Sequence, residues 1–233
     1  MLANIPYSTD KKIIIVSGHF GSGKTCVSVA LALALAKAGK NVTVADLDIV
    51  NPYFRAADAE ALLTSNGIRC INPEFANTNV DIPSLSADIH SIFTTAKSDE
   101  NSVAVLDVGG DSGAAALGRY CHMIDEIGYD MLFVVSKYRP LTDTAELAVE
   151  NLREIEYYSR LRATHTVNNS NVGSETDLGY IEGSFDYADE ICRLSGLPEA
   201  FTSVVKSDFC AELQKRHPGR NFFFIENTTR KLF

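Results

Sequence analysis

The sequence lacks any surplus of positive charge. Its 21 Lys and Arg residues are outnumbered by 30 Asp and Glu residues, which gives a formal net charge of -9 over 233 residues. Non-specific binding to nucleic acid depends on Lys and Arg neutralising phosphates, so we do not expect nucleic acid among the partners of this protein. Net charge does not describe charge distribution, and a small local basic patch is compatible with it.

Long apolar runs are also missing. No stretch approaches the ~20 apolar residues of a membrane-spanning helix, and the first apolar run, Ile13–Val16, is far too short for a signal peptide. The most apolar long segment, Val27–Ala38, has the period of a helix and is expected to be buried. The tail Asn221–Phe233 lacks the spacing of apolar and basic residues seen in surface-anchoring helices. These absences predict a cytoplasmic protein without a membrane anchor.

The cysteines do not form a recognisable framework. There are five of them, an odd number, and no two have the spacing of metal ligands. This pattern predicts unpaired thiols in a reducing compartment. A cluster shared across a dimer is an alternative, because it needs only one or two cysteines from each chain. The five are Cys26, Cys70, Cys121, Cys192 and Cys210.

Short β-branched runs alternate with longer helical patterns along the chain, and this predicts right-handed βαβ units. The runs are almost continuously apolar, which favours strands buried on both faces of a mostly parallel sheet. We therefore expect one doubly wound, three-layer α/β/α domain over residues 1–233. The expected strands are Ile13–Val16, Val42–Ala45, Ile68–Ile71, Val103–Leu106, Met131–Val135, Thr164–Val167, Phe201–Val205 and Phe222–Ile225. The expected helices are Lys24–Ala38, Arg55–Ser65, Leu85–Ala96, Ala114–Ile127, Thr144–Ser159, Asp186–Ser195 and Phe209–Arg216.

A glycine-rich motif follows the first expected strand. It satisfies the pattern G-x-x-x-x-G-K-[ST] of a phosphate-binding loop, between a strand and a helix as that motif requires. Its glycines let successive backbone N–H groups point at phosphate oxygens, its lysine brings a cation to the β- and γ-phosphates, and its threonine hydroxyl can ligate Mg²⁺. The predicted nucleotide-binding residues here are Gly18, His19, Phe20, Gly21, Ser22, Gly23, Lys24, Thr25 and Cys26.

An acidic segment ends the second expected strand. Because ligands of open parallel sheets bind beyond the carboxyl ends of the strands, Asp48 is expected near the phosphate loop. A carboxylate there can orient or deprotonate a water or hold Mg²⁺, and Asp46 is an alternative for this role. A purely structural role for Asp48, as the N-cap of the segment after Pro52, is the competing interpretation.

A second acidic segment ends the fourth expected strand. Asp107 is followed three residues later by Gly110, a pattern typical of γ-phosphate sensing. Asp107 is expected to hold a water bound to Mg²⁺, and the Gly110 N–H to contact the terminal phosphate. The segment that follows is then able to move when the nucleotide is hydrolysed. Lys24, Asp48 and Asp107 are the predicted catalytic residues, and Thr25, Asp48 and Asp107 are the predicted metal-binding residues.

Together these segments resemble the MinD/ParA superfamily of P-loop ATPases, the CobQ/CobB/MinD/ParA proteins of the SIMIBI class. The resemblance covers most of the chain: Gly18–Thr25 is similar to the phosphate loop, Asp46–Asn51 to the first switch and Asp107–Gly110 to the second. It implies that Asp48 activates the attacking water. It also implies a homodimer when nucleotide is bound, and ATP turnover coupled to a protein partner.

The chain departs from the superfamily pattern at two positions, which bear on the catalytic cation and on the class of protein. Many members carry a second lysine directly after the first glycine of the loop, where this chain has His19 followed by Phe20. The cation that would act across the dimer is then to be sought among Arg55, Arg119 and Arg139, although each is more typical of a solvated surface. The position of the cluster-ligating cysteine of the nitrogenase iron protein is Ala114 here, and Cys121 is out of register, which disfavours an iron–sulfur reductase.

The base site is predicted after the strand Thr164–Val167. Asn168 is the expected adenine contact and Asn169 the next candidate, by resemblance to the superfamily. Guanine recognition would require the motif N-K-x-D. The chain has neither lysine nor aspartate at the corresponding positions after Asn168, so ATP is favoured over GTP. A simple turn formed by the asparagines is the alternative. The second wall of the base site is expected around Lys206 and Asp208.

One long polar connection, residues 75–83, is turn-rich and has the composition of either a functional loop or a plain surface loop.

Three functions are compatible with these patterns. The leading hypothesis is a Mg²⁺-dependent ATPase that binds ATP and ADP and switches a dimer or a partner complex, the partner itself being unidentified. The alternatives are an ATP-dependent phosphotransferase or synthetase acting on a small molecule, and a nucleotide-sensing adaptor with little turnover.

Overall fold

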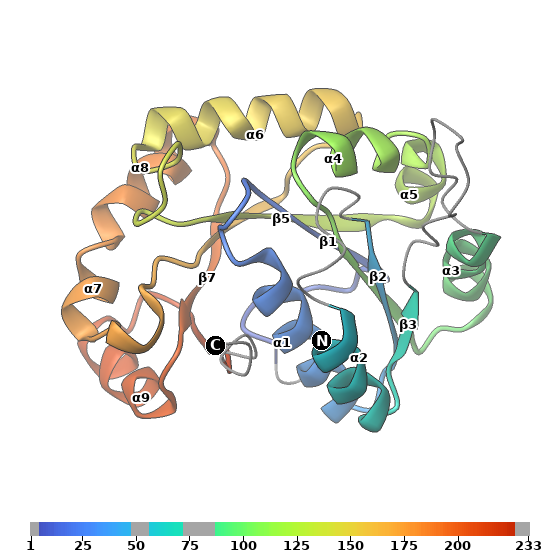
Figure 1. Ribbon diagram of the computed structural model, residues 1–233, viewed down its shortest axis with the longest axis horizontal. Helices are drawn as coiled ribbons and strands as arrows, with labels where there is room; N and C mark the ends of the chain where they lie inside the picture. Colours follow the sequence, from blue (N-terminus) through green and yellow to red (C-terminus); the bar gives the residue numbers. More distant parts are fainter. Residues whose placement is uncertain (1–4, 48–55, 72–86, 227–233) are drawn as a thin grey trace.

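The computed structural model describes residues 5–47, 56–71 and 87–226. Within them, eight parallel strands form one sheet in the order β3-β2-β4-β1-β5-β6-β7-β8 (Figure 1). The predicted doubly wound α/β sheet is confirmed, and among the described residues it is parallel throughout. The strands are β1 (Ile13–Ser17), β2 (Asn41–Asp46), β3 (Arg69–Ile71), β4 (Ser102–Asp107), β5 (Tyr129–Val135), β6 (His165–Asn168), β7 (Glu199–Val204) and β8 (Phe222–Phe224).

Helices cover both faces of this sheet (Figure 1). Residues of α3, α4, α5, α6 and α8 belong to the hydrophobic core on one face, and residues of α1 and α2 to the core on the other. A smaller cluster joins α7 and α9 to the β7–β8 edge. The helices are α1 (Lys24–Lys37), α2 (Ala56–Ser65), α3 (Ala87–Ser98), α4 (Asp111–Leu117), α5 (Cys121–Ile127), α6 (Ala145–Ser159), α7 (Leu178–Glu182), α8 (Phe185–Ser195) and α9 (Ser207–Arg216), with a 3-10 turn, η2 (Gly173–Glu175).

The strand β1 shows why the sequence folds this way. All five of its residues are buried, with Ile13 and Ile15 in one core and Ile14 and Val16 in the other. Side chains of a strand alternate between faces, so a continuous apolar run is stable only with helices on both sides. β1 lies between β4 and β5, which places the loop that follows it at the centre of the sheet's carboxyl edge.

The predicted helix Ala114–Ile127 is wrong as a single element. The structure has two helices there, α4 and α5, separated by residues 118–120. α4 ends with Gly118 as its C-cap, a residue type that disfavours helix interiors, and a Cβ there would lie 2.6 Å from the carbonyl oxygen of Tyr158 in α6. The 3-10 turn η2 and the short helix α7 were not expected at all.

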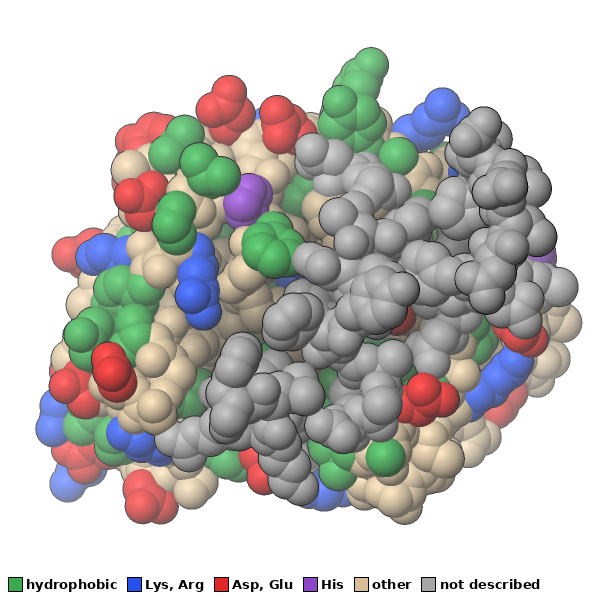
Figure 2. All heavy atoms as spheres, in the orientation of Figure 1, with side chains coloured by type: hydrophobic (Ala, Val, Ile, Leu, Met, Phe, Trp, Pro, Cys, Tyr) green, Lys and Arg blue, Asp and Glu red, His purple; other side chains and the backbone are tan. Residues whose placement is uncertain are grey.

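Several sequence predictions lie outside the described residues. These are Asp48 and the rest of residues 48–55, the polar connection at residues 75–83, and the end of the tail at residues 227–233. No helix within the described ranges is long and apolar enough to cross a membrane. On the face shown in Figure 2, the described Lys and Arg side chains lie among Asp and Glu side chains.

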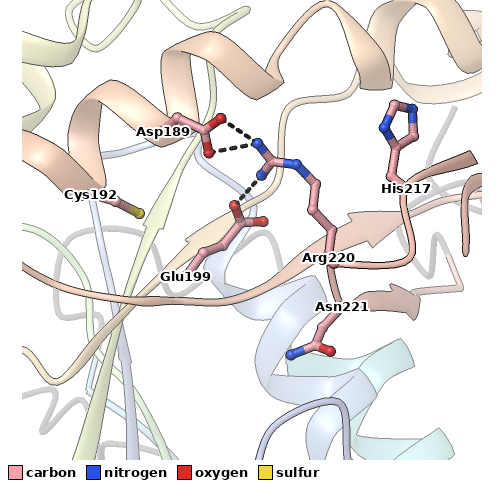
Figure 3. A pocket seen from close by; sticks show the side chains of 7 residues that line it. Asp189, Cys192, Glu199, His217, Arg220 and Asn221 are labelled. Carbon is pink, nitrogen blue, oxygen red and sulfur yellow. Dashed lines mark hydrogen bonds and ion pairs between the residues drawn. The ribbon is translucent and has the colours of Figure 1, made fainter.

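One arginine ties the last two strands to α8 (Figure 3). Arg220 precedes β8, and its guanidinium donates to both carboxylate oxygens of Asp189 at 2.5 Å and to Oε2 of Glu199 at 2.7 Å. The same group lies 4.3 Å from the ring centroid of Phe185. Burial raises the pKa of Glu199, and Arg220 opposes this rise. The arginine therefore offsets part of the cost of holding a carboxylate at the half-buried start of β7.

We expect Arg220→Met to destabilise the protein more at high pH than at low pH. Without the arginine the folded-state pKa of Glu199 rises further above its ordinary value. Stability is then lost as the pH rises from the unfolded-state pKa through the folded-state pKa. Chemical denaturation should show a loss of about 2–3 kcal/mol near pH 8 and clearly less near pH 5. In a Glu199→Gln background the pH dependence of this loss should disappear. An equal loss at both pH values would contradict the assignment.

Candidate phosphate-binding site

The phosphate loop, residues 18–25, connects β1 to α1 and has the backbone that its glycines permit. Gly18 has φ 151° and Gly23 has φ 86°, both in the region that side chains disfavour. A Cβ on Gly18 would collide with the carbonyl oxygen of Val134 in β5, and one on Gly23 would collide with the side-chain amide of Asn169. Glycine is therefore required at both positions by conformation and by space.

Lys24 is the first residue of α1 and is only 1 % exposed. Its Nζ donates to the carbonyl oxygen of His19 at 3.2 Å, so the ammonium lies within the curl of the loop. No side chain caps the N-terminus of α1. The backbone donors of its first turn, together with the positive end of the helix dipole, are an anion-binding arrangement.

Thr25 and Asp107 meet at this edge although 82 residues separate them. The Thr25 hydroxyl donates to Oδ2 of Asp107 at 2.5 Å. Asp46 is the register partner of Asp107 on the neighbouring strand β2. Hydroxyl and carboxylate oxygens are the donors that Mg²⁺ prefers, so the residues present fit this metal. Among the described residues no group of three or more His, Cys, Asp or Glu side chains could hold a metal.

Both predicted switch segments leave the sheet beside the phosphate loop. The Val108 N–H donates to Val16 at 2.9 Å, and the Leu47 N–H donates to the Asp107 carbonyl at 2.7 Å. Gly110 is the N-cap of α4, which begins directly after the second segment. Asp48 follows Leu47 in sequence but lies outside the described residues, so its role stays a prediction.

The two asparagines predicted to meet the base have different surroundings. Asn168 is fully buried, and its amide donates to Ser184 at 2.9 Å and to Thr202 at 3.4 Å. Asn169 faces the phosphate loop, where its amide donates to the Ser22 carbonyl at 2.6 Å and its side-chain oxygen accepts from Ser203. Asn169 therefore holds the loop in place. Ser203 was missed in the sequence because nothing marks a partner that lies 34 residues away.

The segment predicted as the second wall of the base site lies against the loop after β6. Lys206 follows β7, and its Nζ donates to the carbonyl oxygen of Thr176 at 2.7 Å. Asp208 lies in the first turn of α9. The loops after β6 and β7 thus adjoin at the carboxyl edge of the sheet, where the phosphate loop also lies.

The rim of the loop carries the residues that depart from the superfamily pattern. His19 Nδ1 lies 3.0 Å from the Phe20 carbonyl, and the Phe20 side chain is 62 % exposed. Arg139, from the segment between β5 and α6, approaches Gly21, where its Cδ would lie 3.9 Å from an added Cβ. Arg119 instead lines a cavity with Tyr157 and Tyr158, and Arg55 lies outside the described residues.

None of the five cysteines, all of which lie within the described ranges, forms a disulfide. Cys121 is buried at the start of α5, and Ala114 is buried within α4.

Comparisons with known proteins agree with this geometry. Residues 13–176, more than half of the chain, match the family described as CobQ/CobB/MinD/ParA nucleotide binding domain. A curated relative, the cytosolic Fe-S cluster assembly factor cfd1 of Emericella nidulans, is 34 % identical over 99 residues. These residues are 42 % of this chain but only 26 % of that protein, so the chain matches about a quarter of its length.

Solved structures of similar fold include FtsY of Thermotoga maritima, with 19 % identity and a TM-score of 0.53 over 86 % of this chain and 64 % of that one. Chloroplast FtsY of Physcomitrella patens has 14 % identity and a TM-score of 0.57 over 89 % of this chain and 63 % of that one. At these identities the likeness concerns the fold alone, which is that of P-loop nucleotide-binding proteins.

Replacing Asn169 with alanine should weaken nucleotide binding about tenfold, because the Ser22 carbonyl loses the amide that fixes it. Calorimetric titration of the folded protein measures this. Asn168→Ala is the matched control: its amide is bonded inside the fold, so it should lower stability but change affinity less than about threefold. A tenfold loss of affinity in the control would instead show that Asn168 contacts the base.

Proposed function

Because this chain belongs to the CobQ/CobB/MinD/ParA family of nucleotide-binding domains, we propose that it is a Mg²⁺-dependent ATPase whose nucleotide state switches its association with a protein partner. The observation that carries the proposal is the contact between Thr25 and Asp107, beside the buried Lys24. It joins the phosphate loop to the second switch segment, so a change at the phosphates has a direct route to α4.

The chain's own residues account for binding. Backbone N–H groups of the loop and of the first turn of α1 would donate to phosphate oxygens, and Lys24 would bring the compensating cation. Lys24 is already desolvated, so its charge acts in a medium of low dielectric and stabilises charge that develops on the γ-phosphoryl group. Thr25 and Asp107 would hold Mg²⁺, which when bound supplies charge neutralisation at the phosphates.

Asp48 is the proposed residue that positions the attacking water, and Gly110 the one whose N–H senses the terminal phosphate. Loss of that phosphate would release Gly110, and α4 begins at the next residue. The proposal therefore predicts that hydrolysis changes the position or order of α4.

The preference for ATP over GTP rests on the turn after β6. Asn171 stands where a guanine-binding motif would place its aspartate, and its amide donates to the Asn169 carbonyl at 3.1 Å. An asparagine at this position lacks the carboxylate that would accept hydrogen bonds from guanine. ATP is therefore the proposed nucleotide.

A cytoplasmic location remains a prediction.

Lys24→Ala should reduce ATP affinity about ten- to a hundredfold, since a hydrogen bond to a charged group contributes about 1.5–3 kcal/mol. Asp48→Ala should keep ATP binding and abolish phosphate release. Lys37→Ala, an exposed lysine in the last turn of the same helix, is the control and should match the wild type. Phosphate release with Mg²⁺ and with EDTA, for ATP and for GTP, gives the measurement.

Other outcomes of that assay identify the competing functions. Turnover that appears only when a small-molecule acceptor is added would favour a phosphotransferase or synthetase. Tight ATP binding without turnover, unaffected by Asp48→Ala, would favour a nucleotide-sensing adaptor.

A homodimer in the ATP state is the proposed oligomer, and exposed apolar side chains at the loop rim support it. Phe20 is 62 % exposed and Leu141, two residues after Arg139, is 68 % exposed. Leu141 also has φ 69°, a conformation that costs a leucine about 1 kcal/mol. Exposed apolar groups held in place at a strained turn suit an interface. Arg139 approaches Gly21 of the same loop and is the proposed cation for the partner's site.

Leu141→Asn should abolish an ATP-dependent dimer and leave the monomer at least as stable, because asparagine tolerates a positive φ better than leucine. Light scattering with ADP and with a non-hydrolysable ATP analogue tests this. Tyr157→Ser removes an aromatic residue that is 79 % exposed on another element, α6, and should keep the dimer. A wild-type monomer in both nucleotide states would rule out residues that act across a dimer.

A further inference from the structure

A second cavity lies away from the phosphate loop, where the end of α4 meets the end of α6. Its volume is about 530 Å³, and its lining residues are Ala115, Gly118, Arg119, Tyr157, Tyr158 and Arg160. None of these described residues is acidic. In Figure 2, hydrophobic-class side chains stand out from the surface at this edge, next to a Lys or Arg side chain.

The two arginines of this cavity differ from most described arginines because they form no ion pair. Among the arginines that the structure describes, Arg69, Arg153, Arg162, Arg193, Arg216 and Arg220 form ion pairs with described residues, whereas Arg119, Arg139 and Arg160 form none. Arg139 lies at the phosphate loop, and the other two line this cavity. In a protein with net charge -9, two exposed and unneutralised guanidinium groups at one place form a local site for carboxylates.

The tyrosines give the same cavity an apolar wall. Tyr157 is 79 % exposed and Tyr158 45 % exposed, and their rings meet edge to face with centroids 5.4 Å apart. Contact of each ring with the other restricts its motion before anything binds. Tyrosine and arginine are the residues that dominate binding energy in protein interfaces.

Arg160 and Arg119 reach this cavity from different elements. Arg160 is the C-cap of α6 with φ 57°, a left-handed conformation that glycine usually supplies at this position. A cation at a helix C-terminus is favoured by the helix dipole, so Arg160 alone would indicate little. Arg119 reaches the same cavity from the connection between α4 and α5, and that convergence is what points to a ligand.

The helix α4 links this cavity to the nucleotide. In its first turn, a Cβ on Gly113 would lie 2.9 Å from the carbonyl of Leu47, the residue after β2. At its end, a Cβ on Gly118 would lie 2.6 Å from the Tyr158 carbonyl. These contacts are close and involve backbone, and seven residues of helix span only about 10 Å. A shift of α4 at the switch would therefore move one wall of the cavity.

We propose that this Tyr/Arg cavity is the docking site for a partner protein, and that it takes a segment in which aspartate or glutamate residues flank an apolar side chain. The carboxylates pair with Arg119 and Arg160, and the apolar group lies on the tyrosine rings. Two arginines are too few to follow a nucleic-acid backbone, which favours a protein segment. The dependence of this docking on nucleotide rests on the proposed switch function.

The test uses a fluorescein-labelled peptide of sequence EELEEL and fluorescence anisotropy. The wild-type protein should bind it with a Kd below about 1 mM, and the double variant Arg119→Glu/Arg160→Glu should bind it at least about tenfold more weakly. The twin peptide KKLKKL should show the opposite change. Arg193→Glu/Arg216→Glu changes the net charge equally at other helices and should alter neither affinity more than about twofold.

The docking site would be overturned if EELEEL did not bind the wild type. It would also be overturned by equal weakening in both double variants, which would show an effect of net charge only. A single-stranded oligonucleotide that binds the wild type in place of the peptide would also overturn it.

Arg160→Gly separates binding from folding. Glycine relieves the left-handed backbone, so the melting temperature should rise by up to about 4 °C while peptide binding weakens at least about fivefold. A lower melting temperature with unchanged binding would assign Arg160 to the fold and contradict the proposal.

The nucleotide arm repeats the peptide titration with ADP and with a non-hydrolysable ATP analogue. Different affinities are expected. If the peptide binds equally in both nucleotide states but still more weakly to Arg119→Glu/Arg160→Glu, the switch function is contradicted and the docking site stands. If the double variant binds the peptide as the wild type does, the docking site is contradicted and the proposed ATPase stands.

Discussion

The hydrogen bond between Thr25 and Asp107 is the contact on which the proposed nucleotide switch depends. It is possible only because β1 lies beside β4, so that the loop after one strand reaches the last residue of the other. The buried apolar residues of β1 hold that register, and the glycines at 18 and 23 allow the loop to close without striking Val134 or Asn169. The fold thus brings a hydroxyl, a carboxylate and the desolvated ammonium of Lys24 to one edge of the sheet.

The described arginines fall into two groups, those that form ion pairs within the fold and those that are exposed without one. Arg220 is 20 % exposed and pairs with Asp189 and Glu199, so it offsets the cost of holding a carboxylate where β7 begins. Arg119, Arg139 and Arg160 have no such partners among the described residues, and their positions coincide with the two surfaces at which an interaction is proposed. The contrast matters because an exposed, unpaired guanidinium keeps its full capacity for a partner's carboxylate or phosphate.

Much of the fold and part of the site could be predicted from the sequence, for physical reasons. Apolar runs such as Ile13–Ser17 have no stable place except between two helix layers, and the order of residues 18–25 dictates a phosphate loop. The rest depends on contacts between distant segments. The close approach of Gly118 to the backbone of α6 involves a residue 40 positions away, and the different contacts of Asn168 and Asn169 depend on Ser184, Ser22 and Ser203. The left-handed backbone of Arg160 leaves no mark in the sequence.

In the proposed switch, the nucleotide state at the Thr25–Asp107 contact reaches α4, the helix between the phosphate site and the Tyr/Arg cavity. Hydrogen–deuterium exchange of the amides in residues 111–118 measures this directly. With Mg²⁺ and a non-hydrolysable ATP analogue, these amides should exchange more slowly than with ADP, while those of β5 should exchange equally in both states. Identical exchange of residues 111–118 in the two states, at saturating nucleotide, would contradict the proposed switch.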